Sequence, residues 1–184
     1  QWRSLWSGAD FYQIFFLLKP QTKFGGKDKG SPAFARALAE WGQAWDRHIQ
    51  ECGLSAGQVQ FHFLDEPHEP AQYQTLLDWG KAFKAGSKLV ALFNDPCGLS
   101  DKGWGAAQWR ENVELATQAL SYYDIVCPTL EAYRGFPPET RQLFSNLKAQ
   151  GKALWFTCVL VPTAISIPLI SGCNHGLPCR PAQL

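Results

Sequence analysis

Two adjacent carboxylates, Asp65 and Glu66, are the residues of this sequence best suited to do chemistry. They end the apolar segment 61–64 (FHFL) and are followed by Pro67 and His68. Neighbouring side chains of an extended chain project to different sides, so the two carboxylates can address different parts of one ligand. Close carboxylates at a partly dry strand end also raise each other's pKa. The pair is a candidate acid–base site, although an acidic pair in this position is also common as the cap of a following helix.

Apolar segments of this kind recur along the chain, each bounded by Gly, Pro, Asn or Asp. They are rich in aromatic and aliphatic residues and predict buried strands, at 11–18, 59–64, 88–93, 124–127 and 152–157. The amphipathic stretches between them, most with Pro at the start and Gly just past the end, predict helices over 32–49, 70–83, 109–120 and 137–147. Strands that alternate with helices predict a parallel sheet of the α/β class.

Polar or proline-containing residues follow four of these predicted strands. Besides Asp65 and Glu66 they are Asn94-Asp95-Pro96, Pro128-Thr129 and Thr157-Cys158. In a (β/α)8 barrel such strand ends share one face, where active sites lie. An open doubly wound sheet would favour a glycine-rich phosphate turn, and neither GxGxxG nor a Walker sequence occurs. We therefore expect a partial (β/α)8 TIM barrel with parallel strands, incomplete at both ends, because only part of its strands can be found.

Several of these segments, taken together, resemble a known family. Between Trp41 and Trp155 the chain carries Trp41-x3-Trp45-x2-His48 and then the strand ends FLDEP, LFNDP, DIVCP and ALWFTC. This pattern resembles the catalytic barrel of glycoside hydrolase family 123 and the related proteins known as domain of unknown function 4091. The Asp-Glu-Pro at a strand end is the most specific part of the resemblance.

The resemblance implies a retaining hydrolase of terminal β-N-acetylhexosaminides, most of all N-acetylgalactosaminides. In that family the substrate's own 2-acetamido group is the nucleophile, which is a known exception to the usual pair of separated carboxylates. Carried over by motif, Asp65 would orient and polarise the acetamide. Glu66 would be the general acid that protonates the leaving oxygen and then the base that activates water.

Four further residues are candidates for contact with a sugar. Asn94 and Asp95 could bind hydroxyl groups, although Asn-Asp-Pro is equally a turn-forming sequence. Trp155 could stack on a pyranose ring or be a core tryptophan. His68 could tune Glu66 or face solvent. His62, inside its strand, is predicted to be a buried histidine with a hydrogen-bond partner, and Trp41 and Trp45 are predicted to be core residues.

The composition limits the partners. The chain has 184 residues, 46% of them hydrophobic, with 17 Lys and Arg against 16 Asp and Glu, so it predicts a globular domain without the basic excess that nucleic acid requires. The longest apolar stretch, 159–170, is interrupted by Pro162 and Pro168, so we expect no membrane span. We expect a carbohydrate or glycoconjugate substrate, and the oligomeric state stays open. The family resemblance favours a secreted or extracytoplasmic location.

Neither a metal nor another cofactor is predicted. The six cysteines form no CxxC pair, and the spacing of Cys173, His175 and Cys179 matches no established zinc pattern. Cys127 and Cys158 end apolar runs and are predicted to be buried thiols.

The predicted organisation is a partial barrel over residues 1–158 and an unassigned apolar tail over 159–184. We expect the chain to be part of a longer protein, since it starts at Gln1 and contains no Met. On its own it would leave sheet edges unpaired, so we expect it to be poorly soluble or oligomeric and to lack glycosidase activity. The alternative to an enzyme is a catalytically inactive fragment that binds carbohydrate or another partner.

Overall fold

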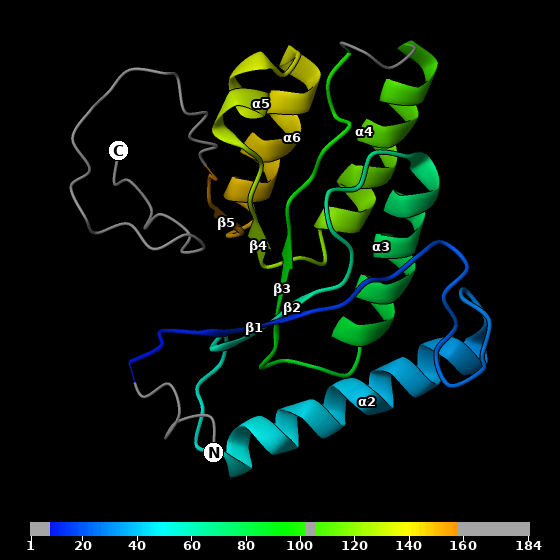
Figure 1. The fold of residues 1–184 in the computed structure, drawn as a ribbon, viewed down its shortest axis with the longest axis vertical. Helices are drawn as coiled ribbons and strands as arrows, with labels where there is room; N and C mark the ends of the chain where they lie inside the picture. Colours follow the sequence, from blue (N-terminus) through cyan, green and yellow to red (C-terminus); the bar gives the residue numbers. More distant parts are fainter. Residues whose placement is uncertain (1–7, 102–105, 158–184) are drawn as a thin grey trace, which may run out of the picture.

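Five short parallel strands form one sheet in which each strand pairs with the next one along the chain (Figure 1). The computed structural model describes residues 8–101 and 106–157. Its strands are β1 (Tyr12–Phe15), β2 (Val59–His62), β3 (Ala91–Asn94), β4 (Ile125–Val126) and β5 (Ala153–Leu154). Its helices are α2 (Pro32–Glu51), α3 (Pro70–Lys84), α4 (Ala106–Leu120), α5 (Leu130–Gly135) and α6 (Pro138–Ala149). The predicted α/β class and the parallel sheet are confirmed.

The strands are shorter than predicted, and β3 begins three residues later than expected. Lys88 and Leu89 were expected in this strand, but their backbone N–H groups donate to the carboxylate of Asp46 on α2, at 2.6 and 3.1 Å. Because these N–H groups are already bound to a side chain of α2, the pairing of β3 with β2 begins only at Ala91.

One short helix was not predicted. Thr129 caps α5, since its hydroxyl accepts from the N–H of Ala132 at 3.1 Å. The sequence predicts Thr129 at a strand end. It lies there too, since it forms a parallel bridge with Thr157. The helix was missed because it has only six residues and no full apolar period.

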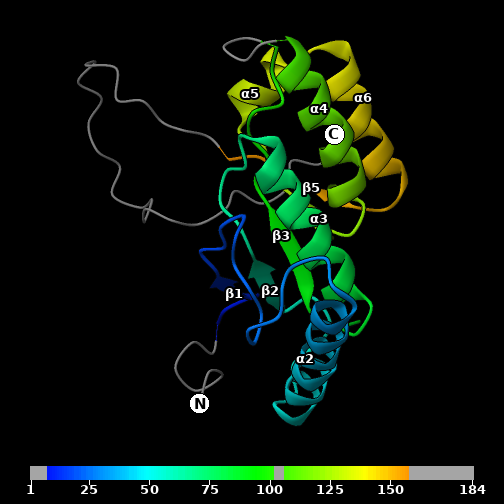
Figure 2. The ribbon, with the colours of Figure 1, turned by 90° about the vertical axis from the view of Figure 1, so that its right-hand side faces the viewer.

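The helices α2, α3, α4 and α6 lie on one face of the sheet (Figure 2). Alternate strand residues point into this helical layer, and in β2 these are Val59 and Phe61, both fully buried. The Phe61 ring lies 5.0 Å from that of Trp45 and 5.4 Å from that of Trp41, both on α2. The prediction that these two tryptophans belong to the core is confirmed.

The opposite face of the sheet carries a second, smaller apolar cluster. Its buried members are Ala91, Phe93, Ile125 and Cys127, and Trp155 packs against them. These residues are one position out of phase with those that face the helices, as the period of two requires. Cys127 is buried, as predicted.

Helices α2 and α3 approach each other so closely that two glycines are required between them. A Cβ atom on Gly86 would lie 1.9 Å from the carbonyl oxygen of Ala39, and one on Gly42 would lie 2.9 Å from that of Phe83. Both obstacles are backbone atoms, which cannot rotate away. The close packing of α2 against α3 therefore depends on the absence of a side chain at Gly42 and Gly86. The same packing keeps the two helices over β2.

We predict that Gly86→Ala lowers the free energy of unfolding by about 2–4 kcal/mol, because the added methyl group must push α2 away from α3. The matched control is Gly135→Ala, where a Cβ atom meets nothing within 4 Å. It should change the free energy by less than about 0.5 kcal/mol. Urea unfolding of both variants checks this, and equal stability for the two would contradict the close approach.

The predicted tail over 159–184, and with it Cys173, His175 and Cys179, lies outside the described residues, as does Cys158. Within the described ranges, every helix is too short or too polar to cross a membrane.

Candidate functional site

The carboxyl ends of β2 and β3 lie side by side. His62 is paired with Phe93 in the parallel register, so the residues that follow each strand leave the sheet at the same edge. This brings together the side chains of Asp65 and Asp95, which are 30 positions apart in the sequence. The convergence expected at these two strand ends is thus present.

One carboxylate oxygen of Asp95 connects the two strand ends. Its Oδ1 atom lies 2.8 Å from Nε2 of His62 and accepts a hydrogen bond of 3.1 Å from the backbone N–H of Glu66. The His62 ring is held edge-on between Phe15 and Phe93, with centroid distances of 4.7 and 4.9 Å. His62 is buried and has a partner, as predicted.

Asp65 has a raised pKa. The largest cause is burial, followed by its hydrogen bond with Asp95 and the negative charge of that residue, whereas the nearby His62 acts in the opposite direction. The charge of Glu66 contributes least to the shift. The sequence predicts such a shift from the adjacent carboxylate, but Asp95 on the next strand contributes more to it than Glu66 does. The Oδ1 atom of Asp65 lies 4.0 Å from Nε2 of His62.

Glu66 has an unusual backbone conformation. Its φ of 41° makes it the one non-glycine residue with positive φ among those described. An L-residue in the left-handed region costs about 1–2 kcal/mol, and such residues concentrate at functional sites. The side chain is 57% exposed, and its Oε2 atom lies 4.0 Å from Nε2 of His68. Both groups can therefore meet a ligand from solvent.

Cys97 lies beside these groups and was not predicted. The sulfur, an oxygen of Glu66 and a ring nitrogen of His68 all lie within 4.8 Å of one another. Burial, and then the charges of Glu66, Asp95 and Asp65, raise the pKa of the Cys97 thiol to about 12. A thiol with this pKa is protonated at neutral pH, which argues against a nucleophilic cysteine. The available signal was its position, directly after the Asn-Asp-Pro of a strand end.

A buried asparagine on α4 ties the two site loops together. The side-chain N–H groups of Asn112, which is fully buried, donate to the carbonyls of His68 and Gly98, both at 2.9 Å. Gly98 has a φ of 64°, and a Cβ atom there would lie 2.6 Å from the carbonyl oxygen of His68. The sequence signal for Asn112 was a polar residue on the apolar side of a helix, between Trp109 and Ala116.

Two other predicted site residues, Asn94 and Trp155, lie outside the carboxylate cluster. Asn94 is fully buried, and its side-chain N–H donates to the carbonyl of Leu64 at 2.9 Å. Trp155 is partly buried on the face that carries Phe93, with 6.3 Å between the ring centroids. Trp155 therefore shares a face with His62, but lies three strands away along the sheet.

The polar residues that follow β4 and β5 pair with each other. Thr129 and Thr157 form a bridge between parallel segments, and the N–H of Leu130 donates to the carbonyl of Thr157 at 2.9 Å. These strand ends are joined to each other, whereas the chemical groups of the candidate site come from β2 and β3.

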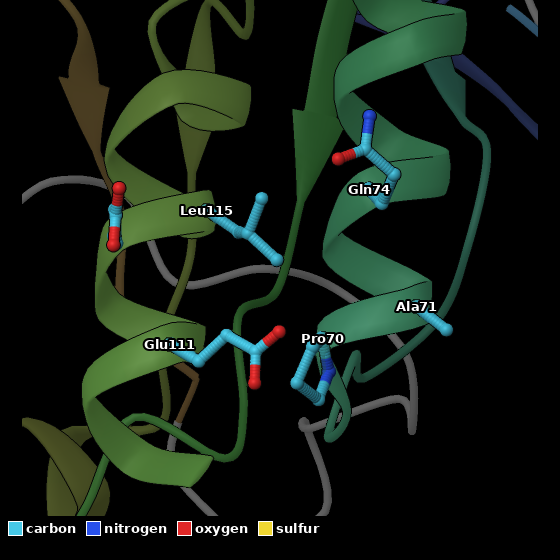
Figure 3. Close-up of a pocket in the computed structure, with 6 residues that line it drawn as sticks. Pro70, Ala71, Gln74, Glu111 and Leu115 are labelled. Carbon is cyan, nitrogen blue, oxygen red and sulfur yellow. The ribbon is translucent and has the colours of Figure 1, made fainter. Parts of the chain in front are cut away.

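A groove of about 560 Å³ lies between α3 and α4, on the outside of the helical layer. In Figure 3 the Glu111 side chain extends from α4 toward Pro70 at the start of α3. The lining residues are Pro70, Ala71, Gln74, Glu111, Glu114 and Leu115. It contains none of the predicted site residues, so we take the carboxylate cluster, where the titratable groups converge, as the candidate site.

The chain was compared with protein-family models, with curated proteins and with solved structures, and none of the three comparisons gave a match.

We predict that Asn112→Ala lowers the free energy of unfolding by about 2–4 kcal/mol, because two carbonyls lose their shared donor and a buried space is left. The control is Gln142→Ala, which removes an exposed side-chain hydrogen bond of 2.9 Å to Asn146. It should cost less than about 0.5 kcal/mol. Thermal unfolding checks both, and a loss for Asn112→Ala no larger than for the control would show that Asn112 does not hold the loops.

Proposed function

We propose that the protein is a retaining glycoside hydrolase that acts on terminal β-N-acetylhexosaminides, with N-acetylgalactosamine as the preferred sugar. The observation that carries the proposal is the meeting of Asp65 and Glu66, at the end of β2, with Asp95 from the end of β3. Substrate-assisted glycoside hydrolysis requires two carboxyl groups close together, one to orient the acetamide and one to transfer the proton, and this cluster offers them.

We further propose that the sheet is part of a (β/α)8 barrel. Each strand pairs with its sequence neighbour, and the order β1-β2-β3-β4-β5 contains no reversal. The four longer helices lie on one face (Figure 2). A doubly wound sheet reverses its strand order and carries helices on both faces. Both observations favour a curved, barrel-like sheet whose helix-free face is the interior, and the cluster then lies at the carboxyl end of that barrel.

In the proposed mechanism, Asp65 accepts a hydrogen bond from the N–H of the substrate's acetamide group. The acetamide oxygen attacks C1 as the bond between C1 and the leaving oxygen breaks, and the Glu66 carboxyl gives its proton to that oxygen. Water then attacks C1 of the cyclic intermediate and loses its proton to the Glu66 carboxylate, which regenerates the acetamide and retains the configuration. The contact between His62 and Asp95 holds the backbone of Glu66 in place.

A second candidate function is carbohydrate binding without hydrolysis. It is favoured by the distribution of the site, because the titratable groups come from two of the five strands and the other strand ends bind each other. Such a protein would bind N-acetylhexosamine through the groups at the ends of β2 and β3, Asp65 among them, but release it unchanged. The two functions are separated by measuring binding and turnover on the same sample.

We predict that Glu66→Gln, in a protein with the complete barrel, lowers the turnover of a poorly activated N-acetylgalactosaminide at least about a hundredfold. This is the usual contribution of general acid–base catalysis. Aryl substrates with strongly activated leaving groups should lose less, because their leaving oxygen needs little protonation. Steady-state kinetics with a series of leaving groups checks this, and an unchanged rate on the least activated member would remove Glu66 from the role of acid.

We predict that Asp65→Asn weakens the binding of a thiazoline mimic of the cyclic intermediate at least about tenfold, because the N–H of the mimic loses a charged acceptor. The affinity for the plain hydroxyl-bearing sugar should change much less. Calorimetry on the wild type and on Asp65→Asn measures these affinities. Equal affinities for the mimic would rule out substrate assistance, whereas tight binding without turnover in the wild type would support the binding protein.

A further inference from the structure

The geometry points to a divalent-cation site formed by Glu66, His68 and Cys97, with Zn²⁺ as the ion that fits its donors best. These three residues offer one oxygen, one nitrogen and one sulfur from the loops that follow two neighbouring strands. The inference concerns binding alone and does not rest on the proposed hydrolase activity.

The distances are close to those of a tetrahedral site. The three donor atoms lie within 4.8 Å of one another, and the pair Glu66 Oε2 and His68 Nε2 is separated by 4.0 Å. Bonds of about 2.0–2.3 Å to zinc place neighbouring ligands about 3.3–3.8 Å apart. The side chains of Glu66 and His68 are 57% and 45% exposed, so small rotations can close the remaining gap without disturbing the core.

The charge around the site also favours a cation. Asp65 and Asp95 lie next to Glu66, and across the described residues the ion-pair partners of these three carboxylates are histidines alone. No permanent positive charge of a lysine or arginine balances them there. A divalent cation would supply that balance.

Side chains of α3 and α4 bind the backbone of the segments that carry His68 and Cys97. The carbonyl of Cys97 accepts from the hydroxyl of Tyr73, and the N–H of His68 donates to the side chain of Gln72 at 2.7 Å. Asn112 fixes the carbonyl of His68 as well. Outer partners of this kind orient metal ligands before the ion arrives, which reduces the ordering that binding requires.

The donor set decides between ions. Binding of Zn²⁺ displaces the proton of the Cys97 thiol into the solvent, and the ion binds the thiolate that remains. A thiolate and an imidazole are poor ligands for Mg²⁺ and Ca²⁺, which take oxygen atoms, but they are the preferred ligands of Zn²⁺. Three protein ligands leave the fourth tetrahedral position open to water or to another carboxylate. A second group of donors, His62, Asp65 and Asp95, lies nearby. It is the weaker candidate, because Nε2 of His62 already binds Asp95.

The test is a titration of the purified, metal-free protein with Co²⁺, followed by displacement with Zn²⁺. We expect a thiolate-to-cobalt absorption band that Zn²⁺ abolishes at one equivalent. Cys97→Ser should remove the band and weaken Zn²⁺ binding at least about a hundredfold, and His68→Gln should weaken it by about ten- to a hundredfold. Circular dichroism and the unfolding temperature without metal show whether the variants fold.

Two controls address the other cysteines of the chain. Cys52 is exposed and lies 3.6 Å from a ring nitrogen of His48, so Cys52→Ser tests this pair as an alternative metal ligand set. The double variant Cys173→Ser, Cys179→Ser tests the two cysteines nearest the end of the chain. Both controls should keep the cobalt band and the Zn²⁺ affinity. Loss of binding in a control with retention in Cys97→Ser, or absence of binding in the wild type, would overturn the proposal.

The outcome is separable from that of the proposed hydrolase. Cys97→Ser removes a metal ligand but leaves Asp65 and Glu66 in place, whereas Glu66→Gln affects both. If Cys97→Ser loses Zn²⁺ and the metal-free protein with the complete barrel shows no turnover, the metal site stands and the hydrolase fails. If the protein hydrolyses the substrate and binds no Zn²⁺, the hydrolase stands and the metal site fails.

Discussion

The candidate site depends on one oxygen atom, Oδ1 of Asp95. It is bound to the imidazole of His62 within β2 and to the backbone N–H of Glu66 after β2, while Asp95 itself belongs to the end of β3. Removing this carboxylate would leave a buried imidazole without its partner and a left-handed residue without its main anchor. The position of the loop after β2 is thus set by the neighbouring strand more than by its own sequence.

That contact is possible only because the sheet has two different faces. The helical face takes up the aromatic rings of α2 and α3, packed around Phe61, and the close approach at Gly86 keeps those helices against the strands. The period of two then sends His62 to the other face, where its ring lies between Phe15 and Phe93. Packing on one side therefore fixes where a titratable group appears on the other.

The sequence was sufficient for the elements and for the most prominent carboxylates. Apolar runs and Pro and Gly boundaries located five strands and four of the helices, and the polar residues after β2 and β3 were expected to meet. Partners that depend on tertiary contacts could not be found in this way. The N–H groups of Lys88 and Leu89 bind a carboxylate 42 and 43 positions away, and Asn112 holds a carbonyl 44 positions away. Cys97 acquires its neighbours only through the register of β2 and β3.

The predominance of acidic groups at this edge has a consequence for what can approach it. Asp65, Glu66 and Asp95 create a negative potential that extends about 8 Å into a solution of physiological ionic strength. Anionic ligands are repelled as they approach this edge of the sheet, whereas neutral and cationic ligands are not. Added salt would weaken this discrimination, so the ionic composition of the surroundings would help to decide which ligands reach the cluster.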